Sequence, residues 1–157
     1  MARTAYQYAL SLLSLRGYTV RNLRRKLVQK GFGADDTTSV MERLIEARLL
    51  DDGQYAREYA RQKLESGGSS VRRVEQELLK KGVSAEEIRS AVTSVIADGD
   101  VDISRSIDLA AKKKLASMGE LDVEVKRRRL FGFLARGGFE ISSIRRVVEE
   151  KVPRGSG

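Results

Sequence analysis

Apolar residues recur along this chain at the three- and four-residue spacing of amphipathic helices, and the same pattern returns about 51 residues later. The stripe predicted for one helix and its copy share their spacing and residue types: Val20, Leu23, Leu27 and Val28, then Val71, Val74, Leu78 and Leu79. Gly31 and Gly82 follow the two stripes, and Gly138 follows a looser third copy. Such a period predicts an array of helical units, each packed on its neighbour.

Each repeat is predicted to contain three helices. The predicted ranges are 4–15, 19–30 and 35–48, then 51–65, 70–81 and 84–96, and finally a helix from 102, one from 122 to 136 and one over 141–151. Gly17 is expected to end the first helix as a C-terminal glycine, and Thr19 to cap the second. The stripe from Val20 to Val28 is expected to be buried. No alternating pattern predicts a strand.

The predicted fold class is therefore all-α, with three tandem three-helix, helix-turn-helix-like repeats forming an elongated array. The predicted boundaries are residues 1–50, 51–98 and 99–152. Residues 153–157 resemble the remnant of a protease-cleavage site left by an expression vector, and they contain the only proline. We exclude them from the functional interpretation.

Composition excludes several kinds of chemistry. The chain contains no cysteine and no histidine, which excludes disulfides, thiolate metal sites and the histidine triads of many hydrolases. Asp51 and Asp52 are paired carboxylates, but their place at a predicted helix start favours capping over catalysis. The Ser- and Gly-rich segment 66–70 lacks the ending of a phosphate-binding loop. We expect no enzyme activity, no cofactor and no metal, and the lack of an apolar span or signal peptide predicts a cytoplasmic protein.

The net charge of +8 is unevenly distributed. Residues 1–50 carry nine basic and four acidic side chains (+5), residues 51–98 carry eight and nine (−1), and residues 99–157 carry thirteen and nine (+4). A basic surface favours nucleic acid or an acidic protein surface as partner. The alternative is that the charge only keeps the protein soluble.

The second helix of every repeat is predicted to carry a basic face, the candidate binding site. The proposed residues share this placement: Arg21, Arg25, Lys26, Lys30, Arg72, Arg73, Lys81, Arg128 and Arg129. The alternative is a solvated helix face without a partner. The third helices are rich in Asp and Glu, which makes them poor readers of DNA bases. Non-specific phosphate contact by the second helices stays open.

The segment from Leu50 to Tyr59, Leu-Asp-Asp-Gly-Gln-Tyr-Ala-Arg-Glu-Tyr, resembles the signature of the RecX family, bacterial regulators of the RecA recombinase. The segment from Glu77 to Val83 and the segment from Lys26 to Phe32 also resemble that family. The resemblance covers nearly the whole chain to about residue 151.

The resemblance implies three tandem three-helix repeats in a curved, elongated molecule. It also implies binding within the groove of the RecA–single-stranded DNA filament, where the family modulates, and mostly inhibits, ATP hydrolysis, strand exchange and co-protease activity. Leu50, Tyr55 and Ala56 of the signature are expected to be structural. The expected partners are RecA and its bound single strand, with free DNA as a further partner. No membrane contact is expected, and the protein is expected to be a monomer.

Two alternatives to a filament regulator remain open at this point. One is a non-specific DNA-binding helical module without a dedicated protein partner. The other is a helical scaffold for an unrelated partner. Only the resemblance separates the filament regulator from them.

Overall fold

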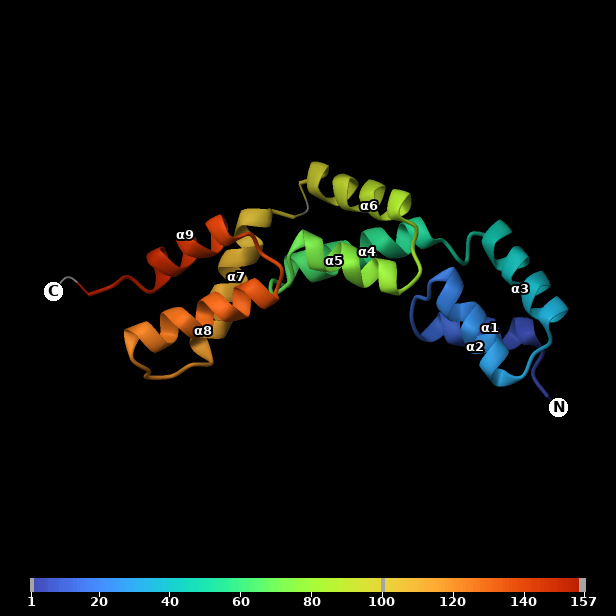
Figure 1. The fold of residues 1–157 in the computed structure, drawn as a ribbon. Coiled ribbons are helices and arrows are strands. Elements are labelled where there is room, and N and C mark those ends of the chain that lie inside the picture. Colours follow the sequence, from blue (N-terminus) through green and yellow to red (C-terminus); the bar gives the residue numbers. More distant parts are fainter. Residues whose placement is uncertain (1, 100, 156–157) are drawn as a thin grey trace. The chain divides into compact units, whose positions relative to one another are not determined.

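The regular secondary structure of the protein is α-helical throughout residues 2–99 and 101–155, which the computed structural model describes (Figure 1). The helices of these residues are α1 (Ala5–Leu15), α2 (Val20–Lys30), α3 (Ala34–Glu46), α4 (Asp52–Glu65), α5 (Val71–Lys80), α6 (Ala85–Ala97), α7 (Ile103–Ala116), α8 (Val123–Arg136) and α9 (Ile141–Lys151). The predicted all-α fold class is confirmed. Ser156 and Gly157 of the suspected vector remnant lie outside the described residues.

Side-chain caps explain why several helices begin where they do. Thr19 accepts a hydrogen bond from the Asn22 amide at 3.3 Å and caps α2, as predicted. Asp51 accepts one from the Gln54 amide at 3.0 Å at the start of α4. Asp102 accepts one from the Ser104 amide at 2.9 Å at the start of α7. Each cap satisfies an amide that has no partner within its own helix.

The chain folds as two compact units. Unit 1 contains the residues up to 58 together with 77–91, and unit 2 contains 59–76 together with the residues from 92 onward. The boundaries between the units fall inside α4, α5 and α6. The division into repeats at residues 1–50, 51–98 and 99–152 therefore stays a prediction.

The core of unit 1 lies among α1, α2 and α3. Leu23 and Leu27 of α2 are fully buried against Met41 and Leu44 of α3, and α1 contributes small side chains such as Ala9. Small residues on α1 let the three helices approach closely. Complete burial of each leucine contributes roughly 2 kcal/mol relative to exposure.

The core of unit 2 lies among α7, α8 and α9, which pack together as a group (yellow to red in Figure 1). Leu130 and Leu134 of α8 and Ile144 and Val147 of α9 are fully buried. Ala111 of α7 is also fully buried against them. The apolar stripe of each helix thus faces the other two, as the helical spacing predicts.

Two expectations about side-chain burial and backbone conformation are wrong. Val28 is 57% exposed, although the helical spacing predicts that it is buried. At about 100° per residue it lies about 140° around α2 from Leu23, so it turns away from the core. Gly17 does not have the left-handed conformation of a glycine cap, and α1 ends at Arg16 in extended backbone. A methyl group on Gly17 would lie 3.3 Å from the Tyr55 ring, so the ring packs closely against this glycine.

Candidate partner-binding interface

The nine predicted basic residues are divided between the two units. In unit 1, α2 carries Arg21, Arg25, Lys26 and Lys30, and Lys81 follows the end of α5. In unit 2 the remaining four are Arg72 and Arg73 at the start of α5, and Arg128 and Arg129 on α8. Each unit therefore presents its own basic group.

Four of the nine side chains project into solvent without a partner in the described residues. These are Arg25, Arg72, Arg128 and Arg129, which are exposed and have no hydrogen bond or ion pair there. A guanidinium in this state keeps all its donors for an external anion, and its planar fork suits a phosphate or carboxylate. These four are the strongest candidates for partner contact.

Other members of the set already contact the protein itself. The Arg21 guanidinium donates to the backbone carbonyl of Lys80, and Arg73 Nη1 donates to the carbonyl of Arg136 at 3.4 Å. The Lys30 ammonium lies 5.5 Å from the centre of the Tyr8 ring. Lys26 is half-buried. Sequence reasoning missed these internal contacts, because they join residues far apart in the chain.

In unit 1, the start of α2 is joined to the end of α5. Thr19 Oγ1 donates to the carbonyl of Lys81 at 2.7 Å, while Arg21 donates to the carbonyl of Lys80. Gly82 follows with a φ of +92°, and a methyl group there would lie 2.8 Å from Arg21 Cβ. Gly82 is therefore required both for its left-handed backbone and for the close approach of α2.

In unit 2, the start of α5 is joined to the end of α8 by equivalent bonds. Ser70 Oγ donates to the carbonyl of Gly137 at 2.9 Å. Gly138 has a φ of +85°, and a methyl group there would lie 2.6 Å from Ser70 Oγ. Two of the three glycines that mark the repeats in sequence, Gly82 and Gly138, thus lie at joints between second helices. At both joints the bonding hydroxyl also caps the helix that begins there.

The two carboxylates of the Asp51–Asp52 pair have different partners. Asp51 caps its own helix, whereas Asp52 Oδ1 accepts a hydrogen bond from the Val20 amide at 2.8 Å and so serves the start of α2. Burial raises the pKa of Asp52, partly opposed by the Val20 hydrogen bond, and the nearby charges of Glu87 and Asp51 raise it further. Among the described residues no three His, Cys, Asp or Glu side chains are grouped to hold a metal ion.

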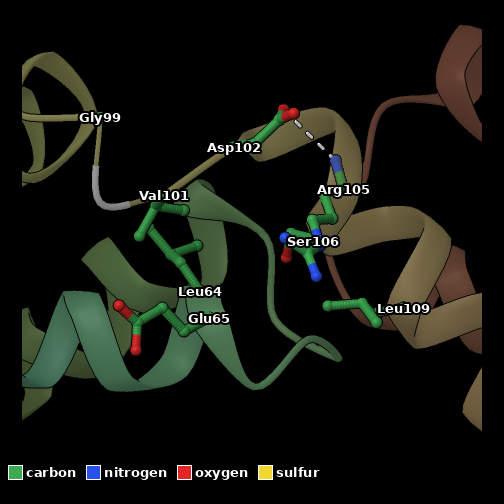
Figure 2. Close-up of a pocket in the computed structure, with 8 residues that line it drawn as sticks. All are labelled: Leu64, Glu65, Gly99, Val101, Asp102, Arg105, Ser106 and Leu109. Carbon is green, nitrogen blue, oxygen red and sulfur yellow. Dashed lines mark hydrogen bonds between the residues drawn. The ribbon is translucent and has the colours of Figure 1, made fainter.

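A cleft of similar size lies in each unit. The cleft of unit 2, about 380 Å³, is lined by Leu64, Asp102, Arg105 and Ser106 and others of α4 and α7, with Asp102 turned to the Arg105 amide (Figure 2). A cleft of about 390 Å³ in unit 1 is lined by residues that stand 51 positions earlier, such as Leu13, Asp51, Gln54 and Tyr55.

The paired clefts follow from the repeat, and the described residues that line them form no assembled reactive group. Asp51 and Asp102 are both engaged as helix caps. Tyr55 has a raised pKa because it is partly buried, so its phenol stays protonated near neutral pH. The clefts therefore give no arrangement for catalysis, and the basic residues remain the candidate interface.

None of the helices within residues 2–99 and 101–155 combines the length and apolar character that crossing a membrane requires.

Sequence models of two RecX domains match this chain. The first three-helix domain of RecX matches residues 5–44, and the second matches residues 51–92. The second match includes the segment from Asp51 to Tyr59 on which the resemblance rests.

The chain is also similar to proteins named Regulatory protein RecX over most of its length. The protein of Trichlorobacter lovleyi is 35% identical over 92% of this chain and 94% of its own. That of Mycobacterium sp. (strain JLS) is 34% identical over 92% of this chain and 79% of its own.

Solved structures share the fold. The crystal structure of RecX from Lactobacillus salivarius matches with a TM-score of 0.72 and 21% identity, over 93% of each chain. Because such identity shows the fold alone, the family rests on the sequence matches. The relatives are regulatory proteins, so this is a regulatory protein and not an enzyme. The chain belongs to the RecX family.

Proposed function

We propose that this protein binds the RecA–single-stranded DNA filament and modulates, mostly by inhibition, its ATP hydrolysis, strand exchange and co-protease activity. It would act as a monomer in the bacterial cytoplasm, in homologous recombination, DNA repair and the SOS response. Membership of a family of regulatory proteins supports this proposal, together with the resemblance of Leu50 to Tyr59 to the family signature.

The observation that carries the mode of contact is the group of exposed arginines that have no partner among the described residues. Within the part of the chain that the structure describes, the guanidinium groups of Arg25, Arg72, Arg128 and Arg129 have no partner and are available to external anions. In a nucleoprotein filament these anions are DNA phosphates and acidic side chains of the protein. Inhibition then follows if the bound chain holds the filament in a state that hydrolyses ATP slowly.

The first test is a titration of this protein into RecA hydrolysing ATP on single-stranded DNA, beside a titration into bare DNA. Inhibition at concentrations well below those that coat bare DNA is the expected result. An unchanged ATPase until the DNA is saturated would contradict a filament regulator.

The interface is tested by charge reversal of Arg72, Arg128 and Arg129 to Glu. The expected result is weaker filament inhibition, because three phosphate or carboxylate contacts become repulsive. A matched triple variant reverses Arg3, Arg89 and Arg145, which are also exposed but lie outside the second helices. Equal loss in both variants would show a general charge effect and would reject the assigned interface.

A non-specific DNA-binding module without a dedicated protein partner is the alternative, favoured by the net charge of +8. Such a module would bind bare single strands as tightly as the filament. Its affinity would fall steeply with salt, since phosphate contacts release counterions. Comparing the salt dependence of binding to bare DNA and to the filament separates the two functions.

A further inference from the structure

Unit 2 contains a groove of about 860 Å³ where α5, α7 and α9 begin. Ile103, Phe139 and Ile141 line it, and Ile103 and Ile141 are 42% and 54% exposed. Large apolar side chains that gather in solvent at one groove are typical of a binding surface.

The internal repeat shows that this apolar surface is not required by the fold. Ile103 stands 51 residues after Asp52, and Phe139 and Ile141 stand 56 residues after Val83 and Ala85. The joint in unit 1 therefore has an acid and two smaller side chains at these positions. At these three positions, only the joint of unit 2 has large apolar side chains.

The same comparison shows a carboxylate that unit 2 lacks. In unit 1, Asp52 accepts the hydrogen bond of the Val20 amide at 2.8 Å. In unit 2, Val71 at the start of α5 is the equivalent of Val20. Ile103 is the equivalent of Asp52, and its side chain has no oxygen to accept a hydrogen bond. Within the described residues the Val71 amide has no hydrogen-bond partner.

A cation without a partner lies at the same end of the groove. Arg72 follows Val71, lines the groove and has no hydrogen bond or ion pair in the described residues. Its equivalent in unit 1, Arg21, is occupied by the carbonyl of Lys80. In unit 2 the corresponding bond is made by Arg73, to the carbonyl of Arg136. The start of α5 thus offers an amide and a guanidinium to an external anion.

We propose that this groove binds a protein segment in which apolar side chains flank an aspartate or glutamate. The carboxylate of this segment would occupy the position in unit 2 that is equivalent to the position of Asp52 in unit 1. Its apolar side chains would cover Ile103 and Ile141. Glu75, Glu140 and Arg146 also line the groove, and Arg146 is paired with Glu150. The two glutamates favour a segment with a single carboxylate over a continuous polyanion such as DNA. The inference rests on the proposed function, since it takes the segment to be part of RecA.

Two variants of the full chain test the groove. Ile103→Asp introduces the carboxylate that closes the joint of unit 1, and Ile141→Ser removes an exposed apolar anchor. Ile45→Ser is the matched control, because Ile45 is 45% exposed on α3 of unit 1. All four proteins are compared for equilibrium binding to the RecA filament, with thermal unfolding as a check of the fold.

The expected result is about tenfold weaker binding for each groove variant, as is typical when an interface anchor is removed, and unchanged binding for Ile45→Ser. If both groove variants fold and bind the filament with wild-type affinity, the groove is not the binding site, while the proposed function stands. Failure of the wild-type protein to bind the filament would overturn both.

A second measurement covers the case in which a variant does not fold. Short peptides that tile the RecA sequence are added to the ¹⁵N-labelled wild-type protein, and the Val71 amide resonance is followed. A peptide with an acid among apolar residues is expected to shift this resonance, and its Asn or Gln counterpart to bind about tenfold more weakly. If no peptide moves the Val71 resonance, the inference is wrong.

Discussion

The side-chain hydroxyl of Thr19 donates a hydrogen bond of 2.7 Å to the backbone carbonyl of Lys81, 62 residues away. The same hydroxyl accepts the Asn22 amide and caps α2. One buried side chain therefore both starts a helix and fixes it to the end of another. Ser70 repeats this relationship with the carbonyl of Gly137.

Replacing Thr19 by Val is expected to destabilise the protein by about 1–3 kcal/mol, because both the cap and the acceptor carbonyl lose a partner in a buried place. Thr19 is fully buried, so the methyl groups of Val occupy the same space. Thr4 is an exposed helix cap, and Thr4→Val should cost about 1 kcal/mol. Urea denaturation of both variants tests whether Thr19→Val costs more stability than Thr4→Val. A larger loss in Thr4→Val would mean that the bond of Thr19 to the Lys81 carbonyl does not stabilise the protein.

Gly82→Ala is expected to destabilise the protein more than Gly31→Ala. Both glycines have a left-handed backbone, which costs any other residue about 1 kcal/mol. A methyl group at Gly31 meets nothing within 4 Å, whereas at Gly82 it lies 2.8 Å from Arg21 Cβ. Thermal unfolding measures the difference. Equal losses would show that the close approach of Arg21 contributes nothing.

Arg48→Gly is expected to stabilise the protein by about 1 kcal/mol. Arg48 has a φ of +54°, the only positive φ of a residue other than glycine within residues 2–99 and 101–155. Gly99, which stands 51 positions later, has a φ of +74°. Glycine removes the strain of this conformation. Ala47→Gly is the control and should destabilise, since Ala47 has an ordinary helical φ of −75°.

Asp52 is expected to make stability fall as pH rises. Burial raises its pKa above 3.8, so the folded state holds the proton more strongly than the unfolded state does. The contribution of Asp52 to the free energy of unfolding therefore decreases as pH rises from about 4 through the raised pKa. Asp52→Asn retains an oxygen acceptor for the Val20 amide but does not titrate.

The free energy of unfolding of Asp52→Asn, minus that of the wild-type protein, should thus grow with pH across this interval. Urea denaturation from pH 3.5 to pH 7 measures it. A difference that shrinks with rising pH would mean that the pKa of Asp52 is lowered in the folded state.

The sequence by itself predicted the helices, several of their caps and the recurring glycines as the points where helices stop. Thr19 was recognised as a cap because it precedes a helical stripe, and the hydrogen bond it accepts spans three residues. Helical spacing and capping depend on neighbours within one turn, so the local sequence contains the information. The family resemblance came from the same continuous segments and was confirmed by the matches over residues 5–44 and 51–92.

Only the tertiary structure decided which basic residues remain available to a partner. Arg21 and Arg25 are both arginines of α2, yet Arg21 is bound to a carbonyl 59 residues away, whereas Arg25 has no partner among the described residues. In the same way Asp52 serves an amide 32 residues away, although the sequence suggested a local cap. These outcomes depend on which surfaces meet when distant segments pack, and no local pattern specifies that.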